Sequence, residues 1–230
     1  MSGSTQGQAG VTMQPVMAGA DHGQSDEDLA RADLYGLLAE LFGGPPTDHF
    51  FNRLAASPKS GDDEPDTPLT QAWHQMVKRA AGSQPAVVRE EFDALFVAVG
   101  KPEVVVNASF YLAGSLNQQP LVDIRHALAD LGIERDPSTS ETEDHFAALC
   151  EVMRFLVAGE LDGDGPPIDL LAAQRSFFVQ HLAPWVGDFF DAIERHRASD
   201  FYKSVAGFAR AFFEVEQQAF DIYAASQPQS

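Results

Sequence analysis

The sequence predicts an all-α fold, a single-domain bundle of about nine or ten helices. Three observations support this fold class. Apolar residues recur three and four positions apart in one segment after another, as on the buried face of a helix. Serine, threonine or proline stands where several of these segments begin, and glycine or proline stands where several end. The chain shows no convincing strand pair, no internal repeat and no linker between two cores.

The chain starts with a polar, glycine-rich stretch and then becomes periodic. Residues 1–25 are expected to form a disordered tail, and the helical domain then covers residues 26–226. Ser25 and Asp28 form an N-cap signal for the first helix. That helix ends at the run Gly43-Gly44-Pro45-Pro46. Its apolar positions share helical spacing: Leu34, Leu37, Leu38, Leu41 and Phe42.

The next segments alternate between short helices and loops. Thr47 is placed to cap a second, short helix. Residues 57–68 form an acidic, proline-rich loop. Helices are expected at Leu69–Ala81 and Pro85–Phe96. The run Val104–Val106 is short, isolated and preceded by a proline, so it is expected to be a packed loop and not a strand.

The second half of the chain continues this alternation. Pro120 suits the first turn of a helix that ends at Gly132. Ser140 and Glu143 have the spacing of a capping box, which predicts that a further helix begins at this point. Gly163–Pro167 is expected to be a loop. Three more helical stretches follow: Asp169–His181, Trp185–Arg195 and Phe201–Ala225.

The charge balance limits the classes of partner. The 230 residues carry 34 acids and 15 bases, a net charge of −19. Such a chain is expected to repel nucleic acid and anionic membranes and to attract basic partners. Residues 1–25 have no basic start and no apolar run, and no segment approaches the ~18 apolar residues of a membrane span. We therefore expect a cytoplasmic protein without stable membrane insertion or nucleic-acid binding.

The residue types that usually carry catalysis are sparse. No two of the seven histidines lie three or four positions apart, and there is no repeated Glu-x-x-His motif, so neither a bound metal nor a resident cofactor is expected. Cys150, the single cysteine, falls on an apolar helix stripe and is expected to be inert. Ser109 lacks the surrounding glycines of a nucleophile elbow. No catalytic residue is therefore predicted.

The segment Glu141–His145 allows two interpretations. Three acids at an expected helix start favour the helix dipole, and His145 would then be half buried at the edge of the stripe while Asp144 points away from it. The second interpretation is that this segment forms a binding surface. An enzymatic alternative also stays open, namely a small helical metal-dependent hydrolase or nucleotide-handling enzyme that uses Asp144 and His145.

Four segments occur in the order found in one family. The chain resembles the TorD/DmsD/NarJ family of redox-enzyme maturation chaperones over about residues 28–225. The segments that carry this resemblance are the following: Asp33–Phe42 with Pro45-Pro46; Glu91–Phe96 with Ser109–Tyr111; Glu141–His145; and Phe178-x-x-His181-Leu182-x-x-Trp185 with Phe201-Tyr202.

The resemblance implies a cytoplasmic, all-helical, TorD-like chaperone and not an enzyme. Such proteins bind the precursor or apo form of a molybdopterin-containing oxidoreductase, often through its twin-arginine leader. They assist cofactor insertion and delay export. A formate dehydrogenase is one candidate client, and a chaperone that binds only the mature apo-enzyme is an alternative. The resemblance is compatible with a monomer or a helix-swapped homodimer.

The resemblance also implies a set of client-binding residues. The family's Glu-Pro-x-Asp-His segment matches Glu141–His145, with Thr142 in place of the proline, and Val105–Asn107 stands where the family loop carries prolines. A receptor for two guanidinium groups and an apolar segment needs carboxylates beside apolar side chains. His145 is expected to change charge near neutral pH. The expected leader-binding set is Leu95, Phe96, Ser109, Tyr111, Glu141, Glu143, Asp144 and His145.

Overall fold

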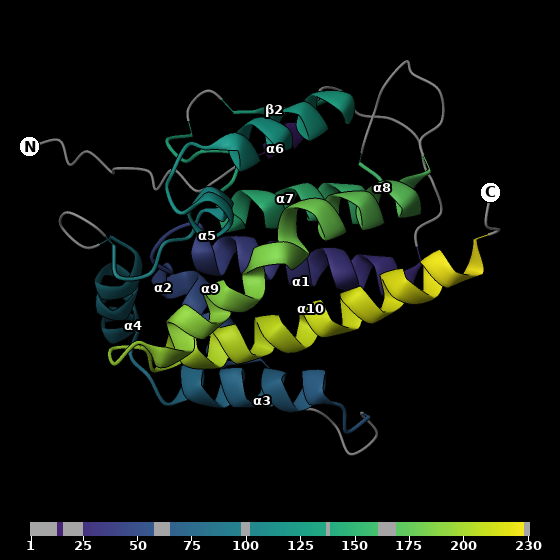
Figure 1. Ribbon diagram of the computed structural model, residues 1–230. Coiled ribbons are helices and arrows are strands. Elements are labelled where there is room, and N and C mark those ends of the chain that lie inside the picture. The colour runs from purple at the N-terminus through teal and green to yellow at the C-terminus, as the bar shows by residue number, and fades with distance from the viewer. Residues whose placement is uncertain are drawn as a thin grey trace, which may run out of the picture. The chain divides into compact units, whose positions relative to one another are not determined.

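The computed structural model describes residues 13–15, 25–57, 65–97, 102–136, 139–160 and 169–227. Within these residues it contains ten α-helices, two π-helical segments and two short strands, so the all-α prediction is confirmed (Figure 1). Most of the predicted loop at 57–68 and the whole loop at 163–167 lie outside the described residues. The predicted tail also lies outside them, except for residues 13–15 and Ser25.

The chain folds into two compact units. The first unit takes its described residues from Met1–Gly44 and Asn107–His181, and the second takes them from Pro45–Val106 and Leu182–Ser230. Each unit therefore combines two stretches that are far apart in the sequence. The single helical domain over residues 26–226 stays a prediction.

The core of the first unit is formed by α1 (Asp26–Phe42) and α7 (Phe146–Val157), which lie side by side. Ser25 caps α1 as predicted, since its side chain accepts a hydrogen bond from the Asp28 amide. Ten of the twelve residues of α7 are buried, which makes it a central helix and not an amphipathic one. Gly36 permits close approach, because a Cβ there would lie 3.0 Å from Cδ of Arg154 on α7.

Three further helices and a strand pair complete the first unit. They are α5 (Ala108–Ala113), α6 (Gln119–Asp130), α8 (Leu170–Phe177) and the antiparallel pair β1 (Met13–Pro15) and β2 (Ile133–Arg135). The strand pair corrects the expectation that the chain has none. Each strand has three residues, which is too short for the alternating pattern that reveals a strand in sequence. Gly132 ends the α6 region with a φ of 68°, as its position predicted.

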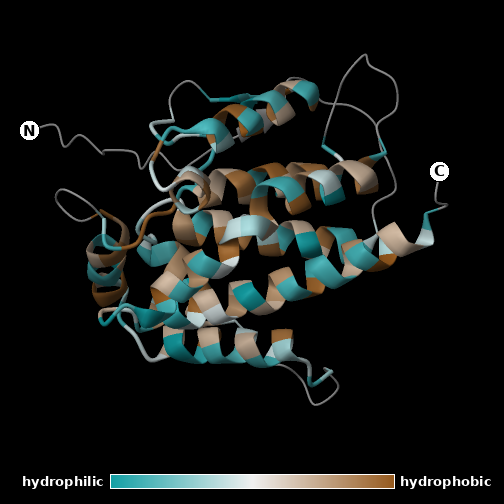
Figure 2. Cartoon of the chain, in the orientation of Figure 1, coloured by the Kyte–Doolittle hydropathy of each residue, from teal (hydrophilic) through white to brown (hydrophobic). Residues whose placement is uncertain are grey.

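The second unit is organised around the long helix α10 (Phe201–Ser226). Helices α3 (Pro68–Ala81) and α9 (Ala183–Arg195) lie against it, and α2 (Asp48–Ala55) lies against α3. Thr47 caps α2 as predicted. The Thr67 hydroxyl caps α3 by accepting the Thr70 amide, and the Thr67 amide donates in return to the Thr70 hydroxyl. Aromatic rings pack edge to face in this unit. The rings of Trp73 and Phe208 are one example, with centroids 5.5 Å apart. The helices show brown and teal faces in Figure 2, which is the pattern that made them predictable.

The helix predicted at Pro85–Phe96 is not uniform. It consists of α4 (Pro85–Phe92) followed by the π-helical segment η1 (Asp93–Val97), and η2 (Phe178–Leu182) similarly follows α8. The predicted packing of Val104–Val106 is present, because Val104 and Val105 are buried and the Val104 amide donates to the Leu95 carbonyl at 3.0 Å. Leu95 lies in the last turn of η1, where a helix leaves its carbonyls without a partner inside the helix.

Candidate functional site

The segment Glu141–His145 does not form the first turn of a helix. Helix α7 begins at Phe146, and its N-cap is His145, whose Nδ1 accepts a hydrogen bond from the Ala147 amide at 3.1 Å. The predicted capping box is therefore wrong. The Ser140 hydroxyl donates to the Glu141 carboxylate at 2.8 Å instead, and Glu143 binds arginines. The acids of this segment lie before the helix and take their positions from other contacts.

Asp144 is buried, with 1 % of its surface exposed, and does not point away from the core as expected. Its Oδ2 accepts a hydrogen bond from the Ser109 amide at 3.0 Å, and its backbone carbonyl accepts one from the Ala108 amide at 2.9 Å. Its Oδ1 accepts hydrogen bonds from Asn107 and Thr142. Asp144 thus caps the start of α5 from a distance of 35 residues along the chain. We call these contacts the Asp144 clamp.

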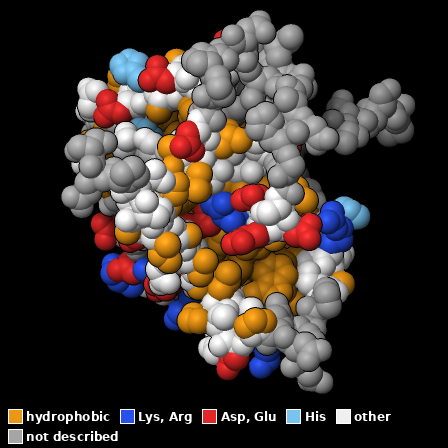
Figure 3. Space-filling view, turned by 90° about the vertical axis from the view of Figure 1, so that its right-hand side faces the viewer, with side chains coloured by type: hydrophobic (Ala, Val, Ile, Leu, Met, Phe, Trp, Pro, Cys, Tyr) orange, Lys and Arg blue, Asp and Glu red, His pale blue; other side chains and the backbone are white. Residues whose placement is uncertain are grey.

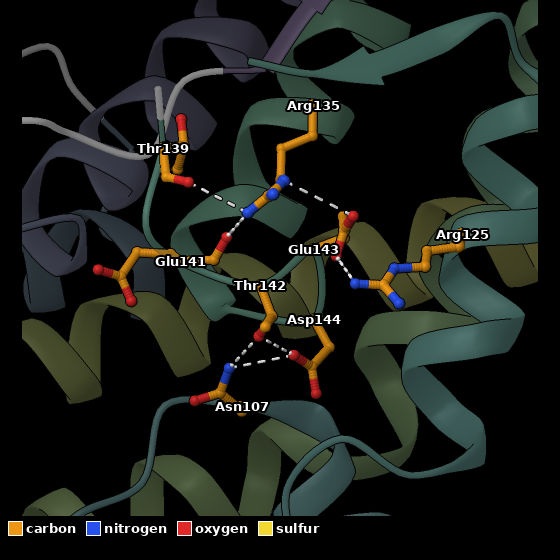
Figure 4. Close-up of polar contacts among 8 residues, drawn as sticks. All are labelled: Asn107, Arg125, Arg135, Thr139, Glu141, Thr142, Glu143 and Asp144. Atoms are coloured by element: carbon orange, nitrogen blue, oxygen red, sulfur yellow. Dashed lines mark hydrogen bonds and ion pairs between the residues drawn. The ribbon is translucent and has the colours of Figure 1, made fainter. Parts of the chain in front are cut away.

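The two departures from the family pattern meet in the Asp144 clamp (Figure 4). Thr142 occupies the position of the family's proline, and Asn107 lies in the loop that usually carries prolines. The Asn107 side-chain amide donates to the Thr142 hydroxyl at 3.0 Å, and the Thr142 hydroxyl donates to Asp144. Burial raises the pKa of Asp144, but the hydrogen bonds from Ser109, Thr142 and Asn107 outweigh burial and hold the pKa below its ordinary value. The carboxyl is therefore charged at neutral pH.

His145 is neutral at physiological pH. Burial lowers its pKa to about 4, although the charges of Glu141 and Asp144 act in the opposite direction. Because Nδ1 accepts the Ala147 amide, the ring proton of the neutral form is on Nε2. The expectation that His145 changes charge near neutral pH is wrong, since the ring is 6 % exposed and poorly solvated.

Glu143 is already paired within the chain. Its carboxylate lies 3.0 Å from a guanidinium nitrogen of Arg125 on α6 and 3.7 Å from Nε of Arg135 on β2 (Figure 4). The bond to Glu143 raises the pKa of Arg125 above its ordinary value. Arg135 also donates to the carbonyls of Thr139 and Glu141, at 3.1 and 2.9 Å. Neither arginine was predicted to take part in the site, although basic residues near an acidic segment in an acidic chain were a usable signal.

Glu141 differs from the other two acids of the segment. Its side chain is partly exposed and points away from Glu143 and Asp144 in Figure 4. Its described hydrogen bond comes from the neighbouring Ser140 hydroxyl, and no arginine is paired with its carboxylate within the described residues. Of the three acids, Glu141 is therefore the one whose carboxylate remains open to an external cation.

The remaining predicted site residues fall in two groups. Ser109 is buried and joins the Asp144 clamp through its amide, while Tyr111 is partly exposed beside Phe110, with ring centroids 5.2 Å apart. Leu95 and Phe96 belong to the second unit, so they are not part of the compact unit that holds Glu141–His145. Leu95 is fully buried, and the ring of Phe96 lies edge-on to those of Phe92 and Tyr202.

Glu91 is a buried carboxylate that was not predicted as a site residue. It accepts hydrogen bonds from three consecutive backbone amides at the start of α10, those of Asp200, Phe201 and Tyr202, at 2.8, 3.0 and 2.8 Å. The local N-cap residue, Asp200, makes no side-chain cap bond. Glu91 thus satisfies three amides that a helix start leaves unpaired. Its place in Glu91–Phe96, one of the segments that carry the family resemblance, was the available signal.

The single cysteine and the acidic and histidine side chains were considered for catalysis or metal binding. Cys150 is buried, and burial raises its pKa well above the ordinary value, so the thiolate is disfavoured. In the described part of the chain, no three His, Cys, Asp or Glu side chains are grouped so that they could hold a metal ion. None of the described helices is long and apolar enough to cross a membrane.

Comparisons with known proteins agree with the resemblance read from the sequence. The nitrate reductase delta subunit family matches residues 62–191, which is more than half of the 230 residues. Chaperone protein TorD of Vibrio cholerae serotype O1 is 27 % identical over 134 residues, 57 % of this chain and 61 % of that protein. Chaperone protein TorD of Vibrio parahaemolyticus serotype O3:K6 is 25 % identical over 130 residues, 55 % of this chain and 60 % of that protein. The chain thus matches about three fifths of the length of these relatives.

A solved structure agrees at the level of the fold. A protein from Archaeoglobus fulgidus, described as a redox enzyme maturation protein, superposes with a TM-score of 0.51 at 17 % identity, covering 81 % of this chain and 93 % of that one. The family match over residues 62–191 and the TorD relatives confirm the resemblance to the TorD/DmsD/NarJ family, and the chain belongs to the family of the nitrate reductase delta subunit and the TorD chaperones.

Proposed function

We propose that this protein is a maturation chaperone that binds the precursor or apo form of a molybdopterin-containing oxidoreductase. Family membership carries this proposal, because the match over residues 62–191 is joined by relatives that are named chaperones. The internal use of the reactive side chains supports a binding role over an enzymatic one. Asp144 holds α5, His145 caps α7, and Cys150 is buried with a raised pKa.

The leader of the client is proposed to bind to the first unit, with Glu141 as the main partner of its arginines. A guanidinium group needs an accessible carboxylate, and Glu143 and Asp144 are buried and internally bonded. Apolar contact is available in the same unit from Tyr111 and from three exposed hydrophobic side chains on α5, α6 and the turn between them: Leu112, Leu116 and Val122. The net charge of −19 accelerates the approach of a basic leader.

In the cell this binding would hold the precursor in the cytoplasm until its cofactor is inserted and would delay export. A formate dehydrogenase is the proposed client.

The first experiment is calorimetry with two probes from the same organism, the twin-arginine leader peptide and the leaderless apo-enzyme. Binding of the leader peptide supports the full proposal. Binding of the apo-enzyme alone supports a chaperone that ignores the leader, and binding of neither probe contradicts the chaperone function.

A variant pair tests the proposed role of Glu141. Glu141→Gln should weaken leader binding about tenfold, because a charge-assisted hydrogen bond contributes about 1.5 kcal/mol, and should leave the melting temperature unchanged. Glu134→Gln is the matched control, since Glu134 is an exposed acid on β2 of the same unit. A leader peptide in which both arginines are replaced by lysine should bind the wild-type protein about tenfold more weakly than the original peptide does. Equal leader affinity of the wild type and Glu141→Gln would remove Glu141 from the site.

A further inference from the structure

The second unit contains an open groove of about 710 Å³ between α3 and the face of α10 against which it lies. Its floor consists of small residues, including Ala72, Gly207 and Ala211. Gly207 widens it, because a Cβ at this position would meet no atom within 4 Å. Neither the segment Glu141–His145 nor the exposed apolar residues of the first unit take part in this groove.

The groove is lined by both basic and acidic side chains, the acids being Glu194, Asp200 and Glu214. Four of the 15 basic residues line it: Lys78, Arg79, Lys203 and Arg210. Arg79 is paired with Asp200 at 2.9 Å, and Arg210 with Asp191 and Glu194 at 2.7 and 3.4 Å. Lys78 and Lys203 are exposed and have no ion-pair partner within the described residues.

The two ends of the groove differ in charge. Lys78 and Lys203 lie where the end of α3 meets the start of α10, and Glu214 lines the opposite end. The rise of 1.5 Å per residue places Lys203 and Glu214 about 16 Å apart along α10. An occupant that complements both ends carries acidic groups at one end, a basic group about three turns away and small apolar side chains between them.

We propose that this groove binds an amphipathic helical segment of the client, with acidic side chains at the Lys78 and Lys203 end. The elongated shape and the apolar floor match the apolar face of such a helix. A phosphate ligand fits less well, because the amides at the start of α10, which would bind a phosphate, are taken by Glu91. The inference rests on the proposed chaperone function and adds a second contact with the client, separate from the leader.

Two variants test the groove by different means, each with a matched control. Gly207→Leu places a side chain in the groove at a position where an added Cβ meets no atom within 4 Å. Gly187→Leu is its control, because Gly187 lies on α9 of the same unit and also has no atom within 4 Å of an added Cβ. The double variant Lys78→Glu/Lys203→Glu reverses the charge of the two lysines that have no ion-pair partner within the described residues. Its control is Arg53→Glu/Arg197→Glu, which changes the net charge equally, since both arginines are exposed in the same unit and do not line the groove.

The probes are the leaderless apo-enzyme and the leader peptide, measured side by side. Both groove variants should bind the leaderless apo-enzyme at least about tenfold more weakly than wild type and should bind the leader peptide unchanged, while both controls match wild type on both probes. Apo-enzyme affinity that is equal in all five proteins overturns the inference. Equal loss of affinity for both probes in folded groove variants also overturns it. A third contradicting result is that a nucleoside triphosphate binds wild type and does not bind the double variant, while the double variant still binds the apo-enzyme. A wild type that binds the leader but no leaderless apo-enzyme also overturns it and leaves the chaperone function standing. Failure of wild type to bind either probe contradicts the function itself.

Discussion

Each of the two compact units has a helix whose start is capped by a carboxylate from a distant segment. In the first unit Asp144 binds the start of α5, and in the second unit Glu91 binds the start of α10. The helices' own N-cap residues, Asn107 and Asp200, make no side-chain cap bond to them. Glu91 accepts hydrogen bonds from three backbone amides. The carboxylate of Asp144 accepts hydrogen bonds from one side-chain amide, one hydroxyl and one backbone amide.

The two buried acids differ in which parts of the chain their contacts depend on. The contacts of Glu91 depend only on backbone amides, so they are insensitive to which side chains surround it. The Asp144 clamp depends on the identities of Asn107 and Thr142, so it connects the loop before α5 to the segment before α7. Acids in segments shared with a family of binding proteins therefore need not touch the client. Here they position the segment whose partly exposed acid is Glu141.

The largest expected effect comes from removing the three-amide cap. Glu91→Ala leaves three amides at the start of α10 unpaired, and we expect the free energy of unfolding to fall by about 4 kcal/mol. Urea unfolding measures this change. Amide exchange should rise at Asp200–Tyr202. Glu90→Ala is the control, because Glu90 is the exposed neighbour and should cost less than about 0.5 kcal/mol. A loss below about 1 kcal/mol for Glu91→Ala would show that water replaces the cap.

A smaller loss is expected in the first unit. Asp144→Asn removes the charge from the Asp144 clamp and turns one acceptor into a donor, and we expect a loss of about 2 to 3 kcal/mol by the same urea measurement. Exchange should rise at the amides of Ala108 and Ser109 and stay unchanged at the start of α10. Asp130→Asn, at an exposed position on α6, serves as the control. A variant that weakens leader binding but keeps wild-type stability would instead place Asp144 in the leader site.

The smallest expected effect is the pH dependence of stability that His145 gives to the first unit. His145 has its folded pKa lowered from 6.5 to about 4, so the unfolded chain binds its proton first as pH falls. The stability that it contributes is complete above its unfolded pKa of 6.5 and is lost as pH falls toward 4. Between pH 7.5 and 5 this loss amounts to about 2 kcal/mol. The pKa of Asp144 is lowered from 3.8, so its contribution is lost only below this window.

The test of this pH dependence compares wild type with His145→Asn in urea at about pH 7.5 and pH 5. Asparagine keeps an oxygen that can cap α7 and removes the titrating ring. We expect the variant to lose less stability than wild type between the two pH values. His181, whose pKa is also lowered by burial, acts in both proteins and cancels in the difference. The same pH dependence in both proteins would assign the effect to other groups.

The features that could be predicted from the sequence are those that depend on neighbouring residues. The caps at Ser25 and Thr47 and the helix end at Gly132 follow from local chemistry and are present in the structure. The capping box at Ser140 and Glu143 has the same local signal, but Arg125 and Arg135 bind Glu143 and remove it from the helix. Contacts between distant segments decided this outcome, and residue spacing alone does not reveal them.

The same limit explains the candidate site. The segments of the site were predicted in sequence, but their burial was not, because a charged residue such as Asp144 is buried only when distant donors compensate for its desolvation. Glu91 was missed for the same reason. The face shown in Figure 3 adds that hydrophobic side chains also reach the surface among acidic and basic ones, so composition alone does not separate core from contact surface.

The contact between Asn107 and Thr142 has a consequence for sequence variation among relatives. A proline at position 142 has no hydroxyl, so a relative with proline there offers Asn107 one acceptor fewer and loses one of the bonds that join the two segments. We therefore expect positions 107 and 142 to change together across the family, as a pair selected for each other and not for the client. Covariation of these two positions would then identify the relatives whose α5 and α7 are linked as in this chain.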